Sequence, residues 1–213
     1  MDSELAVRQL KAIERLVEEF GESPRLAAEG WGEDWKTLIA IILSAQTRDS
    51  KTVAVCEKLF EKYPRVENLA GADLGKIEKD IGSINYYKTK AKNIRETAKI
   101  LVSRGVRFQN SGIRKTEDIV RELMKLPGVG RKTANVYLVA SRNAAAIGVD
   151  THVGRISRKM GWTKEEESHR VEKDLKKLFP REYWNSINWI LVSFGQSVGR
   201  SRVREDEVLG KLL

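Results

Sequence analysis

The sequence has few of the residues that make disulfides, metal sites or membrane spans. Its 213 residues include one cysteine, Cys56, and two histidines, His152 and His169. A single cysteine cannot form an intramolecular disulfide, and so few sulfur and imidazole groups argue against a Cys/His metal site. No apolar run approaches the roughly 20 residues that span a bilayer, and the charged N-terminal segment does not resemble a secretion signal. We therefore expect a cytoplasmic protein with no membrane partner, associated with the nucleoid if the source is prokaryotic.

The charge of the chain is unbalanced toward positive. Lysine and arginine number 39 against 30 aspartate and glutamate residues, which gives a formal net charge of +9. This excess favours an anionic partner such as nucleic acid, through counterion release and long-range attraction. Basic proteins without a nucleic-acid role also exist, so charge alone leaves the partner open. With 41% hydrophobic residues, the chain can bury a core large enough for one large domain or two small ones.

Apolar residues recur at helical spacing along nearly the whole chain, as at Leu5, Leu10, Ile13, Leu16 and Val17. The alternation of apolar and polar residues that is typical of strands is almost absent. Glycine and proline separate the periodic segments, so the sequence predicts an all-α protein with short connections. The predicted helices span residues 3–20, 34–45, 50–62, 73–81, 87–103, 116–124, 131–141, 151–160, 165–178 and 183–198.

Residues 125–134, with the sequence KLPGVGRKTA, combine a tight turn with the start of a predicted helix. Gly128 and Gly130 let the backbone turn sharply and approach a ligand without obstruction by a Cβ atom. The helix that follows adds N–H groups without intrahelical partners and the positive end of a helix dipole. Such a turn suits a phosphate group, although an ordinary glycine-capped connection between helices has the same pattern. A Walker A loop is excluded, because its spacing of glycines and lysine is absent.

The sequence LPGVGRKTA at residues 126–134 resembles the DNA-binding hairpin of the endonuclease III-like glycosylases, which belong to the helix-hairpin-helix superfamily. The resemblance implies a base-excision repair enzyme that acts on double-stranded DNA containing damaged bases or abasic sites. It continues, in the family's order, through LSAQTRD at residues 43–49, INYYKTKAKNI at 84–94 and IGVDTHV at 147–153.

The same resemblance implies the organisation of the fold. The family has two helical domains, with the active site in the cleft between them. We place the domain that carries the helix-hairpin-helix motif at residues 27–141. Residues 1–26 and 142–213 are expected to form the second helical domain, which carries Asp150. We expect the protein to act as a monomer.

Two residues are predicted to carry the chemistry. Lys132, in the hairpin, would attack C1′ of a flipped nucleotide as a neutral amine, a state that burial, the nearby Arg131 and the helix N-terminus would favour. The resemblance implies that the amine forms a Schiff base and that β-elimination then cuts the strand 3′ to the lesion. Asp150 would stabilise positive charge on the sugar and assist proton transfer. A carboxylate at this position also suits a plain helix N-cap.

The resemblance also assigns DNA contacts. Gln46 and Tyr86 match positions that fill the hole left by the flipped base and support the opposite strand, although Gln46 also suits a helix C-terminus and Tyr86 a core. His152 either contacts the DNA backbone and organises the site or is a structural histidine. Further contacts, chiefly to phosphates, are expected at the hairpin and nearby basic residues: Lys88, Lys90, Lys92, Leu126, Gly128, Val129, Gly130 and Arg131.

The chain departs from the family pattern near its C-terminus. Many endonuclease III relatives bind an iron-sulfur cluster through four cysteines that follow a helix corresponding to residues 188–195. This chain has no cysteine there, and such a cluster is held by several thiolates. We therefore expect no iron-sulfur cluster, no other cofactor and no metal, with a short helix within residues 205–213 in that place.

Three functions remain open from the sequence. The first is a bifunctional glycosylase and abasic-site lyase acting on oxidised bases, with pyrimidines as the first candidates. In the second, Asp150 activates water and Lys132 only contacts DNA, so the base is released without strand cleavage. The third is a DNA-binding protein without catalysis, for which the hairpin and the positive charge suffice.

Overall fold

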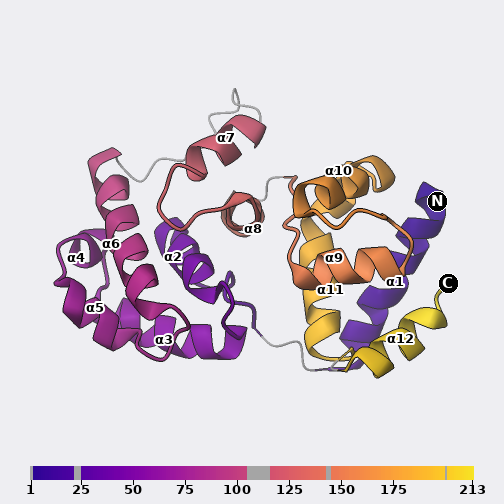
Figure 1. Ribbon diagram of the computed structural model, residues 1–213, viewed down its shortest axis with the longest axis horizontal. Helices are drawn as coiled ribbons and strands as arrows, with labels where there is room; N and C mark the ends of the chain where they lie inside the picture. The colour runs from indigo at the N-terminus through magenta and orange to yellow at the C-terminus, as the bar shows by residue number, and fades with distance from the viewer. Residues whose placement is uncertain (1, 22–24, 105–115, 143–144, 200) are drawn as a thin grey trace. The chain divides into compact units, whose positions relative to one another are not determined.

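The computed structural model describes residues 2–21, 25–104, 116–142, 145–199 and 201–213. These residues form helices, turns and loops, and no strand occurs among them. The predicted all-α class is therefore confirmed. The chain divides into two compact units, which we call the hairpin unit (Arg25–Arg142) and the terminal unit (Met1–Pro24 with Asn143–Leu213) (Figure 1).

The hairpin unit is built around one central helix, α2. The sequence of α2, DWKTLIAIILS, is apolar on nearly all sides, as expected for a helix buried in a core. Trp35 and residues 37–43 are buried, and α2 packs against α3, α6 and α8 (Figure 1). The helices of this unit are α2 (Asp34–Ser44), α3 (Asp49–Lys62), α4 (Val66–Ala70), α5 (Leu74–Asp80), α6 (Tyr87–Arg104), α7 (Thr116–Leu123) and α8 (Arg131–Arg142).

Helix α4 was not predicted from the sequence. Its five residues are too few to show a helical repeat of apolar positions. It forms because Val66 and Leu69 are buried where α4 packs against α6. Tertiary packing, rather than local pattern, therefore stabilises this turn of helix.

The terminal unit joins the two ends of the chain. Helix α11 packs against α1 and α9, and α9 also contacts α10. Within the core of this unit, Gln9 of α1 accepts a hydrogen bond from Trp162 Nε1 (2.9 Å) and donates one to the carbonyl oxygen of Leu212 (3.1 Å). The elements are α1 (Ser3–Glu19), α9 (Thr151–Lys159), α10 (Ser168–Leu178), the 3-10 helix η1 (Arg181–Tyr183), α11 (Trp184–Gln196) and α12 (Arg202–Gly210).

Helix α10 begins three residues later than predicted, at Ser168. The hydroxyl of Thr163 accepts a hydrogen bond from the backbone N–H of Glu165 (3.0 Å) and donates one to Asp174 Oδ2 (2.6 Å). These bonds hold the preceding segment in a turn, an alternative that threonine commonly offers to helix.

In the described part of the chain, no helix is long and apolar enough to cross a membrane.

Candidate functional site

The predicted hairpin is present between α7 and α8. Helix α7 ends at Leu123, and α8 begins at Arg131. The side chains of Leu126 and Val129 are buried, and the backbone N–H of Val129 donates to the carbonyl oxygen of Leu126 (3.1 Å). These two side chains therefore anchor the turn in the core, and any contact they make with a ligand is through the backbone.

Gly128 is the residue that lets the hairpin lie against the core. Its φ angle is +79°, and a Cβ atom there would lie 2.8 Å from Nδ2 of Asn93 and 3.2 Å from Cγ2 of Ile42. Both neighbours belong to the scaffold, one to α6 and one to α2. The hydroxyl of Thr97 adds a hydrogen bond to the carbonyl oxygen of Pro127 (3.1 Å). A Cβ atom at Gly130, by contrast, would meet no atom within 4 Å.

Lys132 and Arg131 lie in the first turn of α8. Lys132 is partly buried, and among the described residues none is recorded as its hydrogen-bond or ion-pair partner. Arg131 forms a two-pronged ion pair with Glu117 of α7, with both N–O distances 2.8 Å. Arg131, which was predicted to contact phosphate, therefore also links α7 to α8. The sequence did not predict its ion pair with Glu117.

The structure brings Gln46 and Tyr86 together. In the described part of the chain, they are the two non-glycine residues with positive φ, at 54° and 58°. Gln46 follows α2 and Tyr86 precedes α6, and the side-chain amide of Asn85 donates to the carbonyl oxygen of Gln46 (2.5 Å). Both side chains are exposed, Tyr86 to 68%. We call Gln46 and Tyr86 the wedge. Their exposed side chains project from two turns with positive φ angles, and the hydrogen bond from Asn85 to Gln46 links these turns.

Lys90 holds the Gln46 turn from inside the protein. Its ammonium group donates to the carbonyl oxygens of Leu43 (2.8 Å) and Ala45 (2.6 Å) and to the hydroxyl of Thr47 (3.2 Å). Lys90 is only 6% exposed, which does not suit the phosphate contact expected from the sequence. It instead caps the C-terminus of α2, where carbonyl groups lack helical partners and a cation is favoured. Lys88, in contrast, is exposed.

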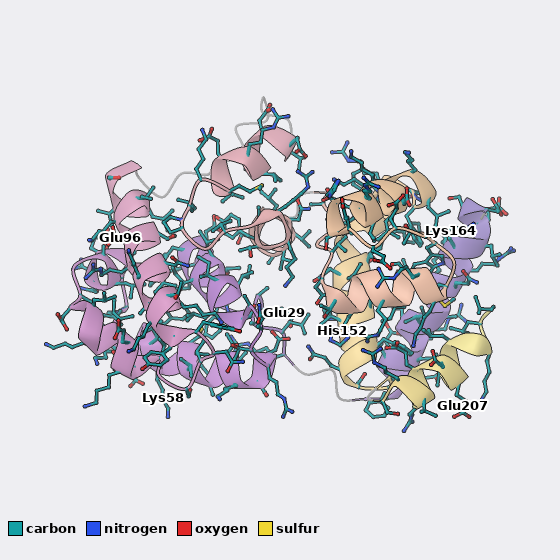
Figure 2. All side chains as sticks on the ribbon, viewed as in Figure 1. Glu29, Lys58, Glu96, His152, Lys164 and Glu207 are labelled. Atoms are coloured by element: carbon teal, nitrogen blue, oxygen red, sulfur yellow. The ribbon has the colours of Figure 1, made fainter. Side chains whose placement is uncertain are left out.

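Asp150 and His152 lie in the terminal unit, at the start of α9, and Figure 2 labels His152. Asp150 is the N-cap of this helix, and its Oδ1 accepts a hydrogen bond from the backbone N–H of Val153 (2.9 Å). The His152 ring lies directly on the backbone of Gly195, since a Cβ atom there would collide with Nδ1. The cap therefore fixes Asp150 on α9, and the contact with Gly195 places His152 against α11.

The residues of this chain do not fit the iron-sulfur cluster of many relatives. Cys56, the single cysteine, is fully buried in α3, and burial raises the pKa of its thiol to about 12. A cluster ligand is a thiolate, and several are needed. Within the ranges that the structure describes, no three His, Cys, Asp or Glu side chains are grouped so that they could hold a metal ion.

A substitution of Gly128 should destabilise the hairpin unit. In Gly128→Ala, the positive φ angle costs about 1–3 kcal/mol, and the new Cβ also displaces Asn93. We expect a lower free energy of unfolding in urea, followed by circular dichroism. Gly130→Ala is the matched control, because its Cβ faces open space. Equal stability of the two variants would contradict the packing described for residue 128.

Replacement of Lys90 should destabilise the protein in a way that depends on pH. Lys90→Met leaves the carbonyls at the end of α2 without their donor, at a cost of about 1–3 kcal/mol, whereas the exposed Lys92→Met should be neutral. Burial lowers the pKa of Lys90 from 10.5 to about 8. Between these values the unfolded chain binds more protons, so wild-type stability should rise with pH relative to Lys90→Met. A flat difference from pH 8 to 10 would disprove this.

Comparison with known proteins identifies the family of the chain. Residues 39–181 match the family described as HhH-GPD superfamily base excision DNA repair protein. Endonuclease III of Thermotoga maritima is 41% identical over 170 residues, which cover 78% of this chain and 75% of the relative. Endonuclease III of Bacillus subtilis is 36% identical over 190 residues, covering 88% of this chain and 84% of the relative.

Solved structures show the same similarity. A trapped covalent intermediate of endonuclease III with DNA has a TM-score of 0.77 and 32% sequence identity, covering 92% of this chain and 87% of that one. A thermostable thymine-DNA glycosylase, at 20% identity and a TM-score of 0.76, covers 97% of this chain and 96% of its own and shares the fold. The chain therefore belongs to the HhH-GPD superfamily of base excision DNA repair proteins.

Proposed function

We propose that this base excision repair enzyme, a DNA glycosylase with lyase activity, removes oxidised bases from double-stranded DNA through a Schiff base at Lys132. Pyrimidines are the first candidates for the base. The observation that carries the proposal is the position of Lys132 in the first turn of α8, directly after the hairpin. The hairpin packs on α2 and α6, and the wedge lies at the ends of the same two helices. The similar endonuclease III structure described as a covalent intermediate with DNA supports a covalent mechanism.

The proposed reaction begins with a nucleotide rotated out of the duplex. The neutral amine of Lys132 attacks C1′, a bond from nitrogen to carbon forms, and the bond from C1′ to the base breaks as the base takes up a proton. The sugar ring then opens as the bond from C1′ to the ring oxygen breaks and that oxygen takes up a proton, which leaves a protonated Schiff base. Loss of a proton from C2′ then expels the 3′ phosphate by β-elimination, and water releases the lysine.

Asp150 would supply the negative charge that this reaction needs. A carboxylate stabilises the positive charge that develops on the sugar and can carry protons to or from Lys132. Its hydrogen bond with the N–H of Val153 fixes the carboxylate, so the cap and the catalytic role are compatible. The proposed mechanism uses Lys132 as the nucleophile and Asp150 as its carboxylate partner.

The wedge would occupy the space that the flipped nucleotide leaves. Tyr86 offers an aromatic face for stacking, and Gln46 offers an amide for hydrogen bonds with the unpaired base. Contacts with phosphate oxygens would come from Lys88, Arg131 and His152, and from backbone groups at Gly128 and Gly130. We propose that the enzyme acts as a monomer and needs neither an iron-sulfur cluster nor another cofactor.

Lys132→Gln should abolish covalent trapping. We expect the wild-type protein to cut duplexes carrying thymine glycol, dihydrouracil or an abasic site, and to form a stable adduct with them in borohydride. The Gln variant should fold normally, bind the same duplexes and form no adduct. Base release without strand cleavage by the wild-type protein would instead identify a monofunctional glycosylase. Binding with no processing of any of these duplexes would identify a non-catalytic protein.

Asp150→Asn separates the two roles of Asp150. Asparagine is as good an N-cap as aspartate, so α9 should keep its cap and the protein its stability. Loss of the charge should slow strand cleavage by about 10²–10⁴-fold, the range typical of proton-transfer groups. Asp150→Ala should lose the cap as well, at about 0.5–2 kcal/mol. A wild-type cleavage rate in the Asn variant would show that Asp150 is only a cap.

A further inference from the structure

Helix α12 is attached to the terminal unit through a buried carboxylate. Its two buried residues are Glu205 and Leu209, and Glu205 is only 1% exposed. An ionised carboxylate is costly to bury unless it is paired and hydrogen-bonded. The partners of Glu205 therefore decide whether α12 can dock in this position.

Two cations of α9 pair with Glu205. Arg155 donates from Nε to one carboxylate oxygen (2.8 Å) and from Nη2 to the other (2.7 Å). Lys159, one turn later, lies 2.8 Å from Glu205 and 2.5 Å from Asp206. Burial alone would raise the pKa of Glu205, but the hydrogen bonds from Arg155 and the positive charge of Lys159 outweigh it and lower the pKa. Glu205 is therefore ionised at neutral pH.

The same arginine also reaches His152. Nη2 of Arg155 lies 3.2 Å from Nδ1 of the imidazole. A guanidinium group can only donate, so a hydrogen bond at this contact requires Nδ1 to accept, which it does in the neutral ring with its proton on Nε2. The pKa of Arg155 is raised, first by the hydrogen bond with Glu205 and further by the negative charge of Asp150. The Arg155 side chain thus contacts both Glu205 of α12 and His152 of α9.

We propose that Arg155 is a positioning residue, which Glu205 of α12 fixes so that His152 is held as a neutral Nε2–H donor beside Asp150. In this form the Nε2–H of His152 is a donor, as the proposed contact with a phosphate oxygen of the DNA strand requires. The inference rests on the proposed roles of Asp150 and His152. It also makes α12 part of the site, in the segment where the family resemblance would place cluster cysteines.

The direct test is the protonation state of His152. The protein contains two histidines, so ¹⁵N spectra of histidine-labelled protein can be assigned with a His169→Gln variant. We expect the wild-type His152 to be in the Nε2–H form at pH 7.5. Glu205→Gln and Arg155→Lys should populate both neutral forms or the protonated ring. Arg155→Lys keeps a cation for Glu205, but its single nitrogen cannot form the two-pronged contact with Glu205 and also reach His152 as the planar guanidinium does.

The functional readout is the rate constant of strand cleavage in single turnover. We expect Glu205→Gln and Arg155→Lys to lower it by about tenfold or more, because an interaction needed in the transition state is lost. Affinity for a duplex with a tetrahydrofuran abasic analogue should change by less than about threefold. Glu207→Gln is the matched control, since Glu207 lies on the same helix with an exposed side chain that pairs only with Lys211 (3.6 Å) among the described residues (Figure 2).

Arg155→Lys decides the outcome even if Glu205→Gln fails to fold. A wild-type cleavage rate and an unchanged Nε2–H form in folded Arg155→Lys would overturn the inference. That result would leave the proposed function intact as long as Lys132 still forms the trapped adduct. A lower rate and a changed imidazole, with the melting temperature close to that of wild type, would support the positioning role over a purely structural one.

Discussion

The close contact of the residue 128 backbone with α2 and α6 is the constraint on which the hairpin unit depends. The turn can approach Ile42 and Asn93 only because Gly128 has no Cβ and tolerates a positive φ angle. The same two helices carry the wedge at their adjoining ends, one turn after Ile42 and two turns before Asn93. One scaffold therefore sets the positions of Lys132, Gln46 and Tyr86 within the unit, although they are far apart in sequence.

Charged groups at helix ends set the remaining geometry. Lys90 caps the C-terminus of α2 and holds the Gln46 turn, and Asp150 caps the N-terminus of α9. Each group satisfies backbone atoms that would otherwise lack partners, and each lies beside a residue with a proposed role. A side chain that caps a helix loses rotational freedom, so a site made from capping residues is already ordered before DNA binds.

Local pattern predicted much of this protein. Apolar periodicity predicted the helical class, and the glycines and lysine of residues 126–134 predicted the hairpin. Both features are encoded by residues close together in the sequence. The sequence could not reveal α4, which only tertiary packing stabilises. Lys90 was predicted to contact phosphate at the surface, because the sequence does not distinguish a buried lysine from the exposed lysines of the same basic segment. The pairs Arg131–Glu117 and Arg155–Glu205 join positions 14 and 50 residues apart, and no local pattern encodes them.

The proposed reaction depends on a covalent bond between Lys132 and the sugar of a damaged nucleotide. The most direct measurement is peptide mapping by mass spectrometry of the adduct reduced with borohydride on an abasic duplex. We expect the added sugar mass on Lys132. Attachment to another lysine, or to the N-terminal amine, would contradict it.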